Sequence, residues 1–223
     1  MSSKRNGIRA EVGERWRFLR RYVRNPTLVG AIAPSSKALA AAVCEPFRLA
    51  KGASTVLEVG AGTGAVTRHL GRILREADRL DICEIQPEFA DILEHEVLCS
   101  PDFIPAVQRG RVRLLRQAVQ TLPGENRYDF VISGLPLSAF ELVELEEVFS
   151  VIRRCLKPDG VFSYFEYVGL RKTSRVLSFG RRRARMRDVS RYLNQNIRAH
   201  EFDRHTVLGN FPPAHARHLR FSA

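Results

Sequence analysis

The stretch TVLEVGAGTG, residues 55–64, decides how this chain folds. Residues 55–59 have the pattern of a buried parallel β-strand, and they lead directly into a turn that is rich in glycine. Glycine lets the backbone turn tightly and lets a ligand approach closely, because no Cβ stands in the way. A helix is predicted to follow from Ala65 to about Ala77. This order of strand, turn and helix predicts an α/β fold with a ligand at the turn.

The sequence on either side continues the alternation of strands and helices. Ser35 and Ser36 are suitable N-caps for a helix that runs to about Cys44 or Phe47. Further elements are predicted as strands over 79–85, 111–115, 128–132 and 161–167, and as helices over 87–98 and 141–155. This spacing is typical of a doubly wound, Rossmann-like parallel sheet. In such sheets ligands bind beyond the carboxyl ends of the strands.

Composition limits the class of protein. The chain has 223 residues, of which 44% are hydrophobic, which suits one domain of ordinary size and excludes a fully disordered chain. The four cysteines, at positions 44, 83, 99 and 155, are scattered and predict reduced, mostly buried thiols. No apolar run reaches the length of a membrane span, and the first 16 residues lack the apolar core of a secretory signal. We therefore expect a cytoplasmic protein whose contact with a membrane is peripheral.

The net charge of +12 is concentrated in two flanks. Residues 4–24 carry eight Lys or Arg and two Glu, and residues 171–191 carry nine Lys or Arg and one Asp. The first flank is predicted to be an amphipathic helix with an aromatic face, which suits either a membrane interface or packing on the core. We expect residues 1–34 to form this helix and a lid, ahead of a catalytic domain over 35–223. The basic segment 171–191, a loop or helix start, suits anionic lipid and RNA equally well, so charge alone does not choose the partner.

Gly60, Gly62 and Ala65 also fit the G-x-G-x-x-A fingerprint of dinucleotide-binding proteins, and two features separate that interpretation from another. Glu58 precedes Gly60 by two residues, and a carboxylate there disfavours the pyrophosphate of a dinucleotide and suits a ligand with a cationic group. A second motif, LKPDG at residues 156–160, precedes the last predicted strand. With these two motifs the chain resembles class I S-adenosylmethionine (SAM)-dependent methyltransferases over residues 35–167. The resemblance implies SAM as methyl donor and S-adenosylhomocysteine as product.

The resemblance also implies the residues that hold SAM. Glu58 and the turn would lie against its amino-acid part, Glu84 would accept hydrogen bonds from the ribose hydroxyls, and Gln117 with Ala118 would flank the adenine. The complete implied set is Glu58, Gly60, Gly62, Thr63, Gly64, Glu84, Ile85, Gln117, Ala118, Ser133 and Leu135. The last two belong to the loop after the fourth strand, which faces the methyl group in this fold.

Two subfamilies differ in the methyl acceptor. Ribosomal RNA adenine dimethylases share a second-strand motif like EIQP at residues 84–87, but they carry Asn-Leu-Pro-Tyr in the fourth loop, where this chain has GLPL at 134–137. In those enzymes the Asn accepts a hydrogen bond from the adenine amine and the Tyr stacks on the base. This chain lacks both side chains, so a nucleic acid substrate is disfavoured. It is similar over more of its length to bacterial phospholipid N-methyltransferases, including GAIAPSS at 30–36. This implies methylation of phosphatidylethanolamine at the cytoplasmic leaflet, with ornithine-lipid N-methyltransferases as close relatives. An RNA methyltransferase and a non-catalytic membrane-binding protein are the alternatives.

Methylation of an amine requires a proton acceptor, and several side chains are candidates. We expect Glu166, Tyr167 and Tyr22 to be catalytic. Substrate-binding candidates, which include an aromatic wall for a cation and a basic group for a lipid phosphate, are Ser35, Phe140, Tyr164 and Arg171. The histidines at 200, 205, 215 and 218 are interpreted as loop and surface residues, and no metal site is predicted.

Overall fold

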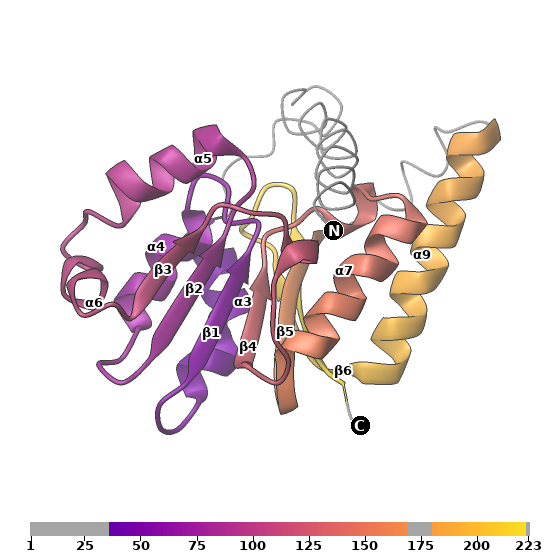
Figure 1. Cartoon of the computed structure of the whole chain (residues 1–223). Coiled ribbons are helices and arrows are strands. Elements are labelled where there is room, and N and C mark those ends of the chain that lie inside the picture. The colour runs from indigo at the N-terminus through magenta and orange to yellow at the C-terminus, as the bar shows by residue number, and fades with distance from the viewer. Residues whose placement is uncertain (1–35, 169–179, 222–223) are drawn as a thin grey trace, which may run out of the picture. The chain divides into compact units, whose positions relative to one another are not determined.

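A computed structural model of the protein describes residues 36–168 and 180–221, apart from the side chains at 180–183 (Figure 1). The predictions for the N-terminal helix, Tyr22, Ser35 and Arg171 lie outside the described residues. The described elements are α3 (Lys37–Leu49), β1 (Thr55–Val59), α4 (Ala65–Ile73), β2 (Arg79–Cys83), α5 (Pro87–Ile92), η1 (Leu93–Val97), α6 (Ile104–Gln108), β3 (Val112–Leu115), η2 (Val119–Thr121), β4 (Tyr128–Ser133), η3 (Leu137–Ala139), α7 (Leu142–Cys155), β5 (Leu156–Tyr167), α9 (Gly180–His200), β6 (Glu201–Val207) and β7 (Ala214–Arg220).

These strands form one seven-stranded sheet in the order β3-β2-β1-β4-β5-β7-β6. Strands β1 to β5 are parallel, as predicted, and the order reverses beside β1, which is the switch point of a doubly wound sheet (Figure 1). Strand β7 is antiparallel to both β5 and β6, so a hairpin extends the parallel sheet on one side. The α/β fold is therefore confirmed, with a mixed sheet rather than a purely parallel one.

The parallel strands end in register. Leu115 of β3, Cys83 of β2, Val59 of β1, Ser133 of β4 and Tyr164 of β5 pair successively in one row across the sheet. The chain leaves β1 and β4 directly beyond this row, whereas β5 continues to residue 167. The glycine turn and the loop after β4 are thus brought to the same edge.

Helices cover both faces of the sheet. Phe47 of α3 contacts Phe130 of β4 on one face, with ring centroids 5.7 Å apart. On the other face Phe149 of α7 lies 5.6 Å from Phe162 of β5 and 5.4 Å from Tyr192 of α9. Burying large aromatic side chains on both faces supplies much of the hydrophobic stabilisation that holds the sheet edge in place.

The helix starts follow from their capping residues. The Ser36 hydroxyl accepts a hydrogen bond from the Leu39 amide at 3.2 Å, which confirms the predicted cap of α3. Helix α7 begins with a capping box, in which Glu144 accepts from the Glu141 amide at 3.0 Å. Among the described residues no helix is long and apolar enough to cross a bilayer.

The start of β5 differs from the prediction. We expected residues 157–160 to close the preceding helix and the strand to begin at Val161, but Leu156 already pairs with Tyr128. The register then shifts, and Asp159 adopts a positive φ of 63°. The motif LKPDG therefore forms an irregularity inside β5, because pairing with β4 exists on both sides of it.

The interpretation of the four C-terminal histidines as loop residues was wrong, because all four lie in α9, β6 or β7, and their interpretation as surface residues was wrong for His218. Residues 201–207 and 214–220 form β6 and β7, and His218 is fully buried. The segment AHARHLR buries Ala214 and Ala216 below α3, in the same cluster as Phe47. The strand is buried on both faces and its sequence AHARHLR shows no alternation of apolar and polar side chains, so it did not stand out in the sequence.

Candidate cofactor and acceptor site

The glycine turn is held by backbone hydrogen bonds. The Gly60 amide donates to the Cys83 carbonyl at 2.9 Å, and the Gly64 amide donates to the Ala61 carbonyl at 3.0 Å. Gly60, Gly62 and Gly64 have φ of +69°, +56° and +83°, a region that other residues rarely adopt. The path of the chain from β1 into α4 therefore depends on glycine.

The three glycines differ in what surrounds them. A Cβ on Gly60 would lie less than 3.0 Å from the Leu135 side chain, and one on Gly64 would lie 2.9 Å from Val97 Cγ2. A Cβ on Gly62 would meet nothing within 4 Å. The first and third glycines are thus required by packing within the chain. Gly62 instead leaves an open face of the turn, where a ligand can approach the backbone.

Glu84 joins the end of β2 to this open face. Its carboxylate accepts from the Gly62 amide at 2.9 Å and from the Gln86 amide at 2.8 Å. Burial raises the pKa of Glu84, while these amides act in the opposite direction. A carboxylate offers about four acceptor positions, so capacity remains for a hydroxyl donor. This arrangement fits the ribose-binding role that the sequence predicts.

Glu58 lies inside the protein, beneath the turn. Both of its carboxylate oxygens are inaccessible to solvent, and burial raises its pKa to about 8, partly offset by Thr67 and reinforced by the charge of Glu84. The carboxyl group is therefore largely protonated near neutral pH unless a cation is present. A cationic ligand on the turn would act on Glu58 through its electric field, because the structure offers no direct contact.

The residues expected around an adenine lie at the ends of β2 and β3. The Gln117 carbonyl accepts from the Cys83 thiol at 3.1 Å, which ties these two strand ends together. Ala118 is buried, whereas Ile85 and Gln117 are half-buried and Thr63 is exposed. The structure thus places Glu84, Gln117 and Ala118 along one edge of the sheet, on the β3 side of the glycine turn, whereas Ser133 and Leu135 lie on its β4 side.

The loop after β4 packs directly on the glycine turn. The Gly134 amide donates to the Val59 carbonyl at 2.9 Å, and a Cβ on Gly134 would lie less than 3.0 Å from the Gly60 carbonyl oxygen. The Ser133 hydroxyl accepts from the Leu135 amide at 3.2 Å. These contacts fix the loop after β4 directly beside the glycine turn.

Arg185 of α9 supports the next part of this loop. Its guanidinium donates to the carbonyls of Ala139 and Phe140 at 2.9 and 3.1 Å, and it lies 3.3 Å from Glu141. Phe140 itself is buried. In the sequence Arg185 is one of many charges available to an anionic partner, and a run of arginines gives no signal that one of them binds the loop.

Glu166, the first catalytic candidate, lies in an ion-pair network. Its carboxylate is 2.7 Å from Arg217 Nε of β7, and the same guanidinium binds Glu201 of β6. All three side chains are largely buried. The network neutralises much of the charge of Glu166 and fixes its position. Arg217 was not singled out from the sequence, since its strand was not recognised.

The aromatic candidates on β5 point to opposite faces. Tyr164 is buried and stacks on Phe162 with ring centroids 5.3 Å apart, on the face of α7. Tyr167 contacts Phe165 at 5.8 Å and packs on the α3 face. Glu166 shares the face of Tyr164, because side chains alternate along a strand. The structure therefore separates Tyr167 from Glu166, although both were placed at the same edge.

Comparison with known proteins agrees with this geometry. Residues 56–160 match a family described as "Methyltransferase domain". The chain is also 32% identical, over 146 residues, to an ornithine lipid N-methyltransferase from Singulisphaera acidiphila. That alignment covers 66% of this chain and 74% of the relative.

Solved structures share the fold at low sequence identity. The 1,6-didemethyltoxoflavin-N1-methyltransferase of Burkholderia thailandensis, with bound S-adenosylhomocysteine, is 18% identical and gives a TM-score of 0.57 over 97% of this chain and 90% of its own. The [4+2]-cyclase SpnF is 16% identical, with a TM-score of 0.57 over 84% and 81%. Since a cyclase shares this architecture, the fold alone does not determine the reaction.

Proposed function

Since this chain belongs to the class I SAM-dependent methyltransferases, we propose that its methyl acceptor is the amine of a membrane lipid. The cofactor is SAM, which supplies a methyl group activated by a sulfonium charge when it is bound. The similarity to an ornithine lipid N-methyltransferase supports an amine-bearing lipid. Phosphatidylethanolamine, the headgroup expected from the sequence, is the first candidate, and ornithine lipid is the second.

The observation that carries this proposal is a group of exposed apolar side chains beside the site edge. Phe211 is 84% exposed and Leu208 is 77% exposed, and both lie in the connection between β6 and β7. Val168, directly after β5, is also exposed. This connection lies at the carboxyl end of β5, because Tyr167 pairs with Ala214. Apolar side chains at this position suit contact with lipid acyl chains near the acceptor.

Hydrogen bonds hold this apolar connection in a defined shape. The buried Asn210 side chain accepts from the Ser36 amide at 3.0 Å and donates to the Pro212 carbonyl at 2.7 Å. The Val168 amide donates to the Pro213 carbonyl at 2.7 Å. The exposed side chains are therefore presented by an ordered backbone, which lowers the entropic cost of inserting them into a bilayer.

The acceptor amine must lose a proton before its lone pair can attack the methyl group. We assign the proton acceptor to Glu166, directly or through water, because its carboxylate is held in place by Arg217. Burial raises the pKa of Tyr167, which keeps its phenol neutral and makes it a poor base. Its ring is better suited to the wall around a methylated cation. The roles of Tyr22, Ser35 and Arg171 stay predictions.

The two basic flanks complete the proposal for the partner, an anionic membrane surface. Each Lys or Arg near an anionic leaflet contributes about 1 kcal/mol, so the flanks and the apolar connection would act together. The full chain should sediment with anionic vesicles and much less with neutral ones. Deletion of residues 1–24 should greatly weaken this binding, and equal binding to both vesicle types would contradict the electrostatic part.

A methyl-transfer assay tests the proposal directly. Labelled SAM is incubated with the full chain and with vesicles containing phosphatidylethanolamine, vesicles containing ornithine lipid, or total RNA, and the products are separated by thin-layer chromatography or gel. We expect label in one of the two lipids. Label in RNA would replace the lipid proposal with an RNA methyltransferase. Binding of SAM without label in any acceptor would favour a non-catalytic membrane-binding protein.

A further inference from the structure

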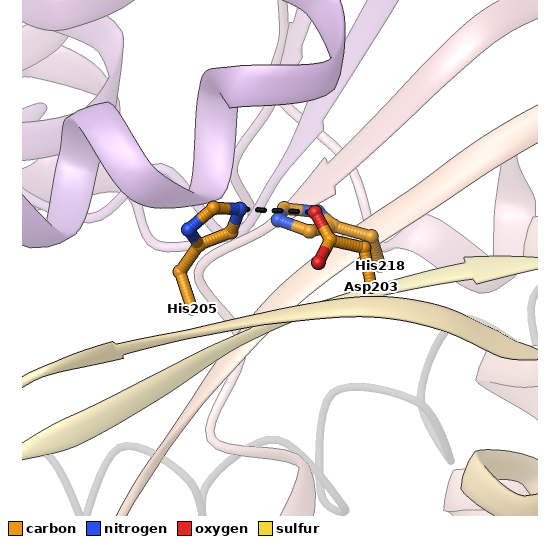
Figure 2. Close-up of side chains that lie close together, drawn as sticks. All are labelled: Asp203, His205 and His218. Carbon is orange, nitrogen blue, oxygen red and sulfur yellow. Dashed lines mark hydrogen bonds and ion pairs between the residues drawn. The ribbon is translucent and has the colours of Figure 1, made fainter.

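A cluster of two histidines and an aspartate lies on the β6–β7 hairpin (Figure 2), which β4 and β5 separate from β1 and its glycine turn. Asp203 of β6 pairs in register with His218 of β7, and His205 follows Asp203 by two residues on the same face. One ligand-type atom from each of the three side chains lies within 4.8 Å of the others. Their order in the chain gives no hint of this cluster, because 13 positions separate the two histidines.

His218 is fixed in an orientation that suits a metal ligand. The residue is fully buried, and its Nδ1 lies 2.8 Å from the Ser163 hydroxyl of β5. Its Nε2 is also buried and has no partner at ordinary hydrogen-bond distance within the described part of the chain, although the Ala42 backbone lies close to the ring. A hydroxyl can accept the Nδ1 proton, and this tautomer leaves a lone pair on Nε2. In metal sites the ring nitrogen that does not bind the metal commonly makes a hydrogen bond, which orients the histidine.

The other two side chains can complete a coordination sphere. His205 Nε2 lies 2.9 Å from Asp203 Oδ2, and both residues are exposed enough to move. Tetrahedral Zn²⁺ with bonds of about 2.0–2.1 Å places its ligand atoms about 3.3 Å apart. A small adjustment of His205 and Asp203 toward the fixed His218 would suffice. Glu45 of α3 faces the two histidines and adds negative charge nearby, although it is paired with Arg48.

We propose that Asp203, His205 and His218 bind a divalent transition-metal ion of the zinc type. Two imidazoles and one carboxylate leave an open position for water, and this donor set suits Zn²⁺ better than Mg²⁺ or Ca²⁺. The ion would join β6 to β7 and to the Ser163 position of β5 beneath them. It would thereby stabilise the hairpin that carries the exposed apolar connection.

A second cluster offers a matched control. Asp91, Glu94 and His95 also lie within 4.8 Å of one another, but all three are exposed. Arg116 already binds both carboxylates, at 2.7 Å from Asp91 and in close contact with Glu94. The positive charge of the guanidinium compensates this cluster and disfavours a metal cation there.

Metal titration of the full chain tests the proposal. Protein without a polyhistidine tag is freed of metal with a chelator and titrated with Zn²⁺ by calorimetry and with Co²⁺ by visible absorption. We expect one equivalent to bind and the melting temperature to rise on addition of Zn²⁺. The exposed variant His205→Ala should fold normally and lose at least tenfold in affinity, and His218→Gln should lose more. The control His95→Ala should bind as the unmodified protein does.

Two results would overturn the proposal. One is the absence of a high-affinity equivalent in the unmodified chain. The other is an affinity that His205→Ala leaves unchanged, which would place the ion elsewhere. Because His218 is buried, His218→Gln is interpreted only together with its circular dichroism spectrum, and the exposed variant decides the outcome. Neither result depends on methyl transfer, so this inference stands or falls independently of the proposed acceptor.

Discussion

Replacing Gly62 with alanine should weaken cofactor binding while leaving the domain folded, whereas the same change at Gly60 should mainly lower the stability of the fold. The difference follows from the space around each residue. A Cβ on Gly62 meets nothing within 4 Å, but one on Gly60 lies less than 3.0 Å from the Leu135 side chain. Both residues have positive φ, so the backbone cost is similar in the two variants.

The magnitudes separate the two variants. An alanine at positive φ costs about 1–2 kcal/mol, of which about 0.4–1 kcal/mol is regained because alanine restricts the unfolded chain. Gly62→Ala should therefore lose about 1 kcal/mol, or roughly 2–4 °C in melting temperature for a domain of this size. Gly60→Ala carries a further overpacking cost of about 1–3 kcal/mol. A methyl group on the open face of Gly62 should weaken S-adenosylhomocysteine binding at least tenfold, which is about 1.4 kcal/mol.

Calorimetric titration with S-adenosylhomocysteine and thermal unfolding measure the two effects on the same samples. We expect Gly62→Ala to lose affinity with a small shift in melting temperature, and Gly60→Ala to show a larger shift. The reasoning is refuted if Gly62→Ala binds with the affinity of the unmodified protein. In that case the open face of the turn would not be where the cofactor lies.

Three further predictions concern other parts of the molecule. Burial in the folded state raises the pKa of Glu58 to about 8, so the ligand-free protein should lose stability as pH rises from about 5 to 8. The free energy of unfolding should fall by up to about 1.4 kcal/mol per pH unit. Urea unfolding measures this slope, and Glu58→Gln should flatten it. Arg217→Ala removes the cation that two largely buried carboxylates share and should lower the free energy of unfolding by about 3–5 kcal/mol. The exposed Arg109→Ala should change the free energy of unfolding by less than about 1 kcal/mol in the same measurement. Substituting aspartate for both Leu208 and Phe211 should weaken binding to sedimented vesicles at least tenfold and leave the affinity for S-adenosylhomocysteine unchanged. The reason is that each apolar side chain contributes about 1.5–3 kcal/mol when it is buried. Unchanged sedimentation would contradict a role of these side chains in lipid contact.

The cofactor half of the site was predictable from the sequence. The strand, turn and helix over residues 55–73 were placed correctly, because a buried strand followed by three glycines is a strong local signal. The position of Glu84 also followed, since it ends the next strand and parallel strands end at one edge. What the sequence did not reveal is that Glu58 is inaccessible beneath the turn. Burial of a single side chain depends on the helices packed above it.

The acceptor half was less predictable, for a reason that particular residues illustrate. Glu166 and Tyr167 are consecutive in a strand, so the alternation of side chains already places them on opposite faces. The partner of Glu166 could not be foreseen, because Arg217 belongs to a strand rich in alanine, histidine and arginine. The same strand hid the burial of His218. A charged residue in such a segment gives the same signal whether it is solvated or paired.

The contacts around the glycine turn and those around Glu166 also differ in the number of residues that separate the contacting side chains along the chain. Gly62 and Glu84, which shape the cofactor side, are separated by 22 residues. Arg185 reaches the Ala139 carbonyl across 46 residues, and Arg217 reaches Glu166 across 51. These two long-range contacts are thus made by α9 and β7, which follow the segment matching the methyltransferase domain family, residues 56–160. Because the contacts of the glycine turn are local and those of Glu166 come from this later segment, we propose that variation in α9, β6 and β7 changes the acceptor without disturbing the turn. The headgroup preference should therefore follow these three elements in chimeras with the ornithine lipid enzyme.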